Sequence, residues 1–236
     1  MKQAKIKALI FDFGGVILDM GWHKMAEIET KYGMKPGSFR SALWGHETWR
    51  QREIGVGSLE DYQQAVLREI EAAAGRPVPE AIADWWAYKR ALNEDLLNLA
   101  ARLRGDYKIG LLSNADEQLE RRLQEDLKIF DRFDVVTNSA RVGLAKPDQR
   151  IYALACEQLQ VEPKAAVFVD DLQRNIDAAR TAGMLAIHFV GDNAALFTEF
   201  KALGIPVEDH ELSAGRFYEM PAEWKAAMAA ASNVSV

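Results

Sequence analysis

The segment Lys5–Phe13 limits the possible folds of this chain most strongly, because it joins a short apolar run to a reactive side chain. Ala8-Leu9-Ile10-Phe11 is continuously apolar, Asp12 follows it, and Gly14 and Gly15 come directly after Phe13. A continuous apolar run bounded by glycine is typical of a buried strand in a parallel sheet, so we predict a strand over Lys5–Phe13. A carboxylate at the end of such a strand stands where open α/β sheets present reactive groups, although Asp near Gly is also ordinary turn chemistry.

Apolar runs and helical stretches alternate from Asn93 onward. This alternation predicts right-handed βαβ units and a doubly wound parallel sheet, which is a Rossmann-like α/β core. The predicted helices are Asp95–Leu103, Asp116–Gln124, Asp148–Leu159 and Arg174–Ala182, and the predicted strands after the first are Tyr107–Leu112, Phe133–Thr137, Ala165–Asp170 and Met184–Phe189.

The region between the first strand and this alternating part has no strand-like run. Glycines separate its helical stretches, as expected of breakers between helices. We therefore predict a core of residues 1–18 and 91–204, an all-helical insertion of residues 19–90, and a C-terminal extension of residues 205–236. The predicted helices of the insertion are Gly21–Tyr32, Pro36–Leu43, His46–Ile54, Leu59–Ala74 and Pro79–Ala87.

Three later segments carry polar residues that could accompany Asp12. Ser113 and Asn114 end the second apolar run, Lys146 precedes a proline and a helical stretch, and Asp170-Asp171 ends another strand-like run. In this order, and with a helical insertion after the first strand, the four segments resemble the motifs of the haloacid dehalogenase (HAD) superfamily. The resemblance extends roughly from Lys5 to Val190 and identifies residues 19–90 as a helical cap that closes over the catalytic loops.

The resemblance implies a hydrolase that acts on a small phosphorylated substrate. Asp12 would be the nucleophile and form an aspartyl-phosphate, which divides one difficult displacement into two easier ones. Lys146 would neutralise charge on the phosphoryl group. Ser113 would bind a phosphate oxygen, helped by the backbone N–H groups of Asn114 and Ala115. Gly15 would let the backbone approach the substrate closely.

The adjacent carboxylates Asp170 and Asp171 would repel Asp12 unless a cation lay between them. Mg²⁺ prefers such oxygen ligands. The resemblance makes Asp12, Asp171 and the Gly14 carbonyl the direct ligands and Asp170 an outer partner. It also gives Asn175 the role of orienting the acidic loop. One of the two aspartates could instead cap the following helix.

Position 14 departs from the pattern of the family, because most of its phosphatases carry a second Asp there as general acid and base, whereas this chain has Gly14. A Mg²⁺-dependent phosphatase of a small phosphorylated metabolite, with sugar phosphates among the candidate substrates, remains our first interpretation. The alternatives are a non-catalytic or very slow protein that binds phosphorylated ligands, and a metal-free 2-haloacid dehalogenase, for which paired aspartates are unnecessary.

The composition excludes several other classes. A net charge of −6 and a pI near 5.4, with no basic block, argue against nucleic-acid binding. The single cysteine, Cys156, cannot form an intramolecular disulfide and fits a reducing compartment. No apolar run suggests a signal peptide or a membrane span. We therefore expect a cytoplasmic monomer or homodimer, and we expect Phe217, Tyr218, Met220 and Trp224 of the extension to dock on the core or on a second subunit.

Overall fold

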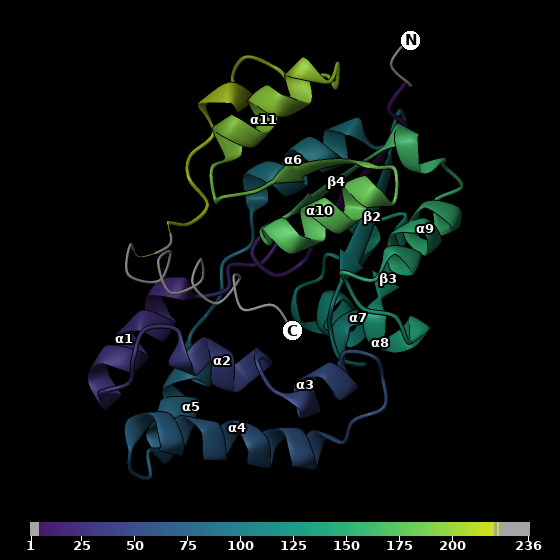
Figure 1. Cartoon of the computed structure of the whole chain (residues 1–236). Coiled ribbons are helices and arrows are strands. Elements are labelled where there is room, and N and C mark those ends of the chain that lie inside the picture. The colour runs from purple at the N-terminus through teal and green to yellow at the C-terminus, as the bar shows by residue number, and fades with distance from the viewer. Residues whose placement is uncertain (1–4, 220, 222–236) are drawn as a thin grey trace. The chain divides into compact units, whose positions relative to one another are not determined.

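The computed structural model describes residues 5–219 and residue 221, and the chain forms two compact units (Figure 1). The first unit holds residues 5–19, Glu53–Gly55 and Leu92–Tyr218. The second holds Met20–Arg52 and Val56–Ala91. Glu53–Gly55 is notable because these three residues lie in the middle of the helical insertion in sequence, yet they pack with the first unit.

The first unit is built on a parallel five-stranded sheet, which confirms the predicted fold class. The strand order is β3-β2-β1-β4-β5, so the chain starts in the centre, builds one half of the sheet and then crosses to the other. Such a crossing is the switch point at which open α/β sheets hold their ligands. The strands are β1 (Ala8–Phe11), β2 (Lys108–Ser113), β3 (Val135–Asn138), β4 (Ala166–Asp170) and β5 (Leu185–His188).

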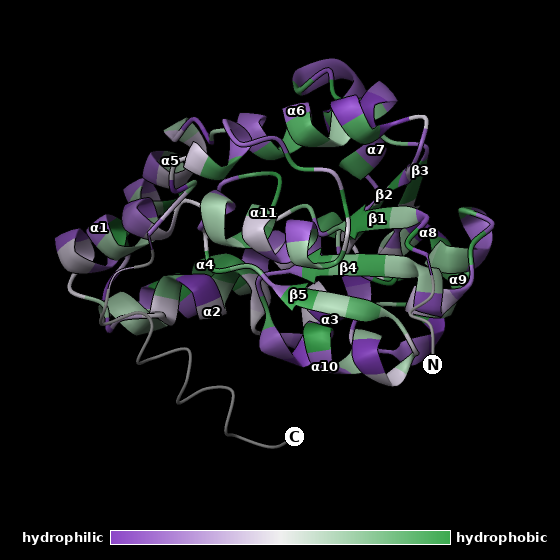
Figure 2. Cartoon of the chain, turned by 90° about the horizontal axis from the view of Figure 1, so that it is seen from above, coloured by the Kyte–Doolittle hydropathy of each residue, from purple (hydrophilic) through white to green (hydrophobic). Residues whose placement is uncertain are grey.

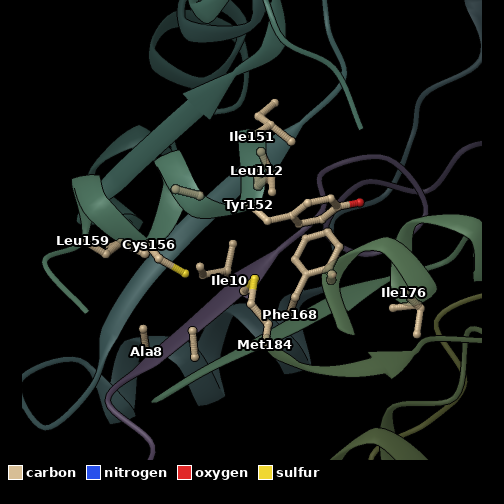
Figure 3. Close-up of a cluster of buried hydrophobic side chains, with 13 residues drawn as sticks. Ala8, Ile10, Leu112, Ile151, Tyr152, Cys156, Leu159, Phe168, Ile176 and Met184 are labelled. Atoms are coloured by element: carbon tan, nitrogen blue, oxygen red, sulfur yellow. The ribbon is translucent and has the colours of Figure 1, made fainter. Parts of the chain in front are cut away.

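Both faces of the central strands are buried, as their apolar sequence requires. Residues of β1 and β4 are completely shielded from solvent, and Figure 2 shows these strands as largely hydrophobic. One face forms a cluster in which Ile10, Phe168 and Met184 meet residues of helices α9 (Gln149–Gln158) and α10 (Gln173–Thr181) (Figure 3). Cys156 lies in this cluster, where burial raises the pKa of its thiol to about 11 and makes it an inert packing residue.

Six α-helices in the described part of the first unit accompany the sheet. The predicted helix Asp116–Gln124 is wrong at its start: the α-helix begins at Leu119 and continues as a π-helix over Arg122–Asp126. The Asp116 carboxylate accepts the N–H of Gln118, a local bond that competes with helix formation. The helices are α6 (Glu94–Leu103), α7 (Leu119–Arg121), α8 (Ser139–Val142), α9 (Gln149–Gln158), α10 (Gln173–Thr181) and α11 (Asn193–Ala202).

The second unit is all-helical in its described part. Ser58 caps α4 (Leu59–Ala74) by accepting the N–H of Asp61, and the buried Trp85 ring packs against Phe39 in a T-shaped arrangement. The predicted helix His46–Ile54 ends at Arg52, where the chain leaves for the first unit. The helices of the second unit are α1 (Trp22–Tyr32), α2 (Ser38–Trp44), α3 (Glu47–Arg52), α4 (Leu59–Ala74) and α5 (Pro79–Ala87).

The C-terminal extension begins by packing on the first unit. Tyr218 is buried with its ring edge-on to Phe189, and the Phe217 N–H donates to the Gly191 carbonyl. The other two residues expected to dock, Met220 and Trp224, lie outside the described residues. Among the helices that the structure describes, we find none with the length and apolar character needed to span a membrane.

Candidate active site

Three strands end side by side at the carboxyl edge of the sheet. Phe11 of β1 pairs in register with Leu111 of β2 and with Val169 of β4. Asp12 directly follows Phe11, and its N–H donates to the Val169 carbonyl at 2.9 Å. Parallel strands in this register place the predicted residues that follow β1, end β2 and end β4 at one edge.

Lys146 is the centre of this group. Its Nζ lies 2.8 Å from Asp12 Oδ1 and 2.7 Å from Asp170 Oδ2, and it donates to the Leu112 carbonyl at 3.1 Å. The Lys146 side chain is only 1% exposed. An ammonium group has three protons to donate, and the three acceptors here are two carboxylate oxygens and one carbonyl oxygen. The buried Lys146 ammonium is therefore fully hydrogen-bonded. The two ion pairs therefore hold Asp12 and Asp170 on either side of one cation.

Asp170 is fixed by neighbours as well as by Lys146. It is completely buried, its Oδ1 accepts the N–H of Leu172 at 2.8 Å, and the Asn175 amide lies 3.0 Å from both carboxylate oxygens. The Tyr152 hydroxyl in turn donates to the Asn175 carbonyl at 3.0 Å. Asn175 thus contacts Asp170 directly, and these hydrogen bonds hold the Asp170 carboxylate in place.

The carboxylates of Asp12, Asp170 and Asp171 come close enough to share a cation. One oxygen from each lies within 4.8 Å of the others. Gly15 makes this possible: it has φ +81°, and a Cβ atom there would lie 2.4 Å from Asp171 Oδ2. Three hard oxygen donors in this space suit Mg²⁺, so the residues present fit the predicted ion. The part of the Gly14 carbonyl in holding it stays a prediction.

The surroundings of the Asp12 carboxylate disfavour its ionised form. Burial raises the pKa of Asp12 to about 7; Lys146 opposes this rise, and Asp170 adds to it. Burial lowers the pKa of Lys146, but Asp12 and Asp170 outweigh that effect and leave it raised, so Lys146 is charged. The site has more negative than positive side chains, which is the environment that a divalent cation stabilises.

The residues that follow Ser113 make different hydrogen bonds from those predicted. The Ala115 N–H, predicted to bind phosphate, instead donates to the Ser139 hydroxyl at 3.0 Å. The Asn114 side chain is held by the Lys146 backbone, because its Nδ2 donates to the Lys146 carbonyl at 2.9 Å and its Oδ1 accepts the Lys146 N–H at 2.7 Å. Ser113 is buried at the end of β2. Because the Asn114 side chain is already bonded to the Lys146 backbone, the predicted phosphate binding by Asn114 falls to its backbone N–H.

Two residues at this edge of the sheet were missed by sequence reasoning. Ser139 is completely buried and bonds both backbone groups of Ala115. It follows β3 directly, so the position of a polar residue just after a predicted strand was a usable signal. Glu53 lies in the sequence of the helical insertion but accepts a hydrogen bond from Asn114 Nδ2 at 3.3 Å. No local pattern marks that contact.

Comparison with known proteins agrees with the geometry. A family model described as a haloacid dehalogenase-like hydrolase matches residues 6–183. The chain is 28% identical over 200 residues to the sesquiterpene phosphatase astK of Aspergillus oryzae, covering 84% of this chain and 96% of that protein. It is 26% identical over 186 residues to the D-ribitol-5-phosphate phosphatase of Bacteroides thetaiotaomicron, covering 75% and 89% of the two chains.

Solved structures show the same fold. A HAD family enzyme from Bacteroides thetaiotaomicron, in complex with magnesium and inorganic phosphate, has a TM-score of 0.59 at 23% identity, with 78% of this chain and 93% of that chain covered. The L-2-haloacid dehalogenase of Xanthobacter autotrophicus has a TM-score of 0.58 at 19% identity, with 98% and 100% covered. Because one neighbour contains magnesium and phosphate and the other is a dehalogenase, the fold alone does not choose between the two reactions.

Proposed function

Because this chain belongs to the haloacid dehalogenase-like hydrolases, we propose that it is a Mg²⁺-dependent phosphatase that transfers the phosphoryl group of a small metabolite to Asp12. The observation that carries the proposal is the close grouping of the Asp12, Asp170 and Asp171 carboxylates, of which Asp12 and Asp170 both pair with the buried Lys146. A dehalogenase has no need of the paired aspartates. Relatives named as phosphatases, including one for D-ribitol 5-phosphate, support a phosphorylated substrate, with a sugar or polyol phosphate as the first class to test.

The reaction has two displacements at phosphorus. In the first, an oxygen of the Asp12 carboxylate attacks, the bond from phosphorus to the leaving oxygen breaks, and that oxygen takes a proton from water. In the second, a water molecule attacks the phosphorus of the aspartyl-phosphate, releases inorganic phosphate and a proton, and restores the carboxylate. The ion pair with Lys146 and the bond from the Phe13 N–H at 2.7 Å keep Asp12 in one orientation throughout.

The other residues of the site would balance the negative charge of the carboxylates and the phosphate. Asp12, Asp171 and the Gly14 carbonyl would hold Mg²⁺, and Asp170 would support them through its bonds to Lys146 and Asn175. When bound, the ion would supply positive charge that favours the ionised carboxylates and offsets their repulsion of an anionic phosphate. Lys146 provides a second, permanent positive charge next to the nucleophile.

Gly14 decides which substrates react fast. A general acid and base is worth roughly 10²–10⁴ in rate, and a glycine cannot supply one. Leaving groups that need little protonation, such as anomeric sugar phosphates, acyl phosphates and aryl phosphates, should therefore react faster than alkyl phosphates. Attack of water on the aspartyl-phosphate also lacks a base at position 14, so this second displacement should limit turnover.

The test is hydrolysis of 4-nitrophenyl phosphate in the presence of Mg²⁺ and then of EDTA. We expect activity that requires Mg²⁺, a burst of nitrophenol, and a phosphorylated protein detectable by mass spectrometry. Asp12→Asn should abolish both the activity and the adduct. Chloride release from 2-chloropropionate without a metal would instead identify a dehalogenase. Absence of both activities, with phosphate still bound, would identify a non-catalytic binding protein.

We further propose that residues 19–90 determine which leaving group is accepted. Replacing this insertion by the corresponding segment of a relative with a different substrate should change the order of preference among phosphate esters. Hydrolysis of 4-nitrophenyl phosphate serves as the control for the integrity of the core. An unchanged order of preference in an active chimera would contradict this assignment.

A further inference from the structure

A hollow of about 650 Å³ lies in the first unit where the central strands begin. It is lined by the segment before β1, by the turn between α6 and β2, and by the residues that end α9. Lys7 precedes β1 and Lys108 opens β2, whereas Asp12 and Ser113 stand at the opposite ends of these two strands. The positions from Lys7 to Asp12 span roughly 16 Å of extended chain, so the hollow is separate from the candidate active site.

Apolar side chains make up part of the lining of this hollow. Ile6 and Leu159 are buried there, and the half-buried Tyr107 and Val161 add further apolar surface. Sites for small molecules combine such an apolar lining with a few polar groups, and their volumes run from roughly 300 to 1,000 Å³. The hollow therefore has the size and the surface of a small-molecule site.

The hollow carries excess positive charge, although the whole chain has a net charge of −6. Arg104 and Asp134 both line it and neutralise each other through an ion pair at 3.1 Å. The other charged lining residues are Lys5, Lys7, Lys108 and Asp106, three positive charges and one negative, which leave a sum of +2. A recess with an excess of one sign of charge attracts ions of the other sign.

The three lysines of the hollow form no ion pair with any residue that the structure describes. Lys7 influences one carboxylate just outside the lining, that of Glu162, whose pKa is lowered. The main cause of that lowering is Lys164, which pairs with Glu162 at 2.6 Å, and Lys7 only adds to it. The positive charge of the lysines is therefore available to a ligand.

Gln160 is a second feature of the hollow that points to a ligand. It has φ +58°, and among the described residues only one other non-glycine residue, Lys128, has a positive φ. Gln160 follows α9, and its N–H donates to the Glu157 carbonyl at 2.9 Å, a helix end at which glycine takes this conformation without steric cost. Its side-chain amide forms no hydrogen bond with a described residue. Strained backbone of this kind gathers at ligand sites, where the side chain has a use.

We propose that this hollow is a second ligand site, independent of the phosphatase reaction, for an organic anion with an apolar body. Lys5, Lys7 and Lys108 attract the anionic group, and the Gln160 amide donates a hydrogen bond to it. The apolar body covers the lining around Leu159 and leaves water, which adds affinity that a small inorganic anion cannot gain. The site therefore selects for ligands that carry both a negative charge and an apolar part.

The experiment uses two fluorescent probes with nearly the same apolar body. 8-Anilinonaphthalene-1-sulfonate is an anion, whereas N-phenyl-1-naphthylamine lacks the sulfonate and is neutral. Both are titrated into the full chain in EDTA, and we expect the anion to bind more tightly. The double variant Lys7→Gln/Lys108→Gln should weaken binding of the anion by about tenfold and change that of the neutral probe by less than about twofold. Gln160→Ala keeps a side chain at this backbone conformation but removes the amide, and it should weaken binding of the anion by about threefold.

The matched control is the double variant Lys31→Gln/Lys201→Gln. It removes the same amount of charge from two exposed lysines that pair with Asp84 and Asp209 and line no part of the hollow. It should leave the affinity for both probes unchanged, and circular dichroism checks that every variant is folded. The inference is overturned if the anion does not bind, if the control weakens it as much as Lys7→Gln/Lys108→Gln does, or if the two probes lose affinity equally. None of these measurements depends on phosphatase activity, so the inference can fail while the proposed function holds.

Discussion

Replacing Asp12 by Asn should stabilise the metal-free protein, and the gain should grow with pH. Burial is the main reason that the pKa of Asp12 rises from 3.8 to about 7 in the folded chain. The folded state thus binds the Asp12 proton more tightly than the unfolded state does. The stability that this tighter binding contributes is fully present below about pH 4 and is lost as the pH rises towards 7.

The structure gives the size of the effect. One pKa unit corresponds to about 1.4 kcal/mol, so a shift from 3.8 to about 7 amounts to roughly 4 kcal/mol when complete. Asn keeps the shape of the protonated side chain, and its Oδ1 can still accept the bonds from the Phe13 N–H and the Lys146 ammonium. The difference in unfolding free energy between Asp12→Asn and the wild type should therefore increase by about 3 kcal/mol between about pH 5 and about pH 8.

The assay is urea unfolding of both proteins in EDTA across this pH range, followed by circular dichroism. Repeating it with saturating Mg²⁺ provides the control, because bound metal stabilises the ionised wild type and should remove the advantage of the variant. A difference that stays constant with pH in EDTA would refute the reasoning. So would a variant that is less stable than the wild type at about pH 8, since the ion pair with Lys146 would then outweigh the cost of burying the carboxylate.

Three further substitutions probe separate parts of the structure. Gly15→Ala should weaken Mg²⁺ binding in calorimetry by about 10- to 100-fold, because the added Cβ would displace Asp171. The control is Gly33→Ala, which has a similar backbone conformation but no atom within 4 Å of the added Cβ, and it should leave Mg²⁺ affinity unchanged. Gly14→Asp should raise the rate on alkyl phosphates more than on aryl phosphates, by up to about 10²-fold, and equal gains on both would contradict an acid/base role for this position. Asn93→Ala should cost about 2 kcal/mol of unfolding free energy in urea titrations, because it removes a buried amide that bonds the Val16 carbonyl and a second buried Asn; a loss below about 0.5 kcal/mol would show that the gap is refilled.

The strands and the main helices of the first unit could be predicted because their signal is local. The apolar runs before Asp12 and before Asp170 each mark a buried strand. The strand β4 matches the predicted Ala165–Asp170 within one residue, whereas β1 covers only Ala8–Phe11 of the predicted Lys5–Phe13. The helix expected from Asp116 was placed too early, since a side chain there bonds the backbone that would have opened the helix. Helix α11 was not predicted at all, although Asp192 caps it by accepting the Ala195 N–H.

The site could be anticipated only in part, for a geometric reason. Residues that follow parallel strands gather at one edge of a sheet, so the sequence was enough to predict that Asp12, Ser113 and Asp170 would lie at the same edge. Lys146 lies between strands in sequence, and only the folded chain shows that it is buried between two carboxylates.

Tertiary structure alone decided the contacts that tune this edge. Ser139 takes the Ala115 N–H, the Asn114 side chain serves the Lys146 backbone, and Glu53 returns from the helical insertion to join them. These contacts join residues 24 to 61 positions apart in the chain. Hydrophobic periodicity reports which face of a helix or strand is buried, but it contains no information on which distant polar group will satisfy a given amide. The chemistry of the strand ends was therefore readable from the sequence, whereas the contacts of Ser139, Asn114 and Glu53 became visible only after folding brought these residues together.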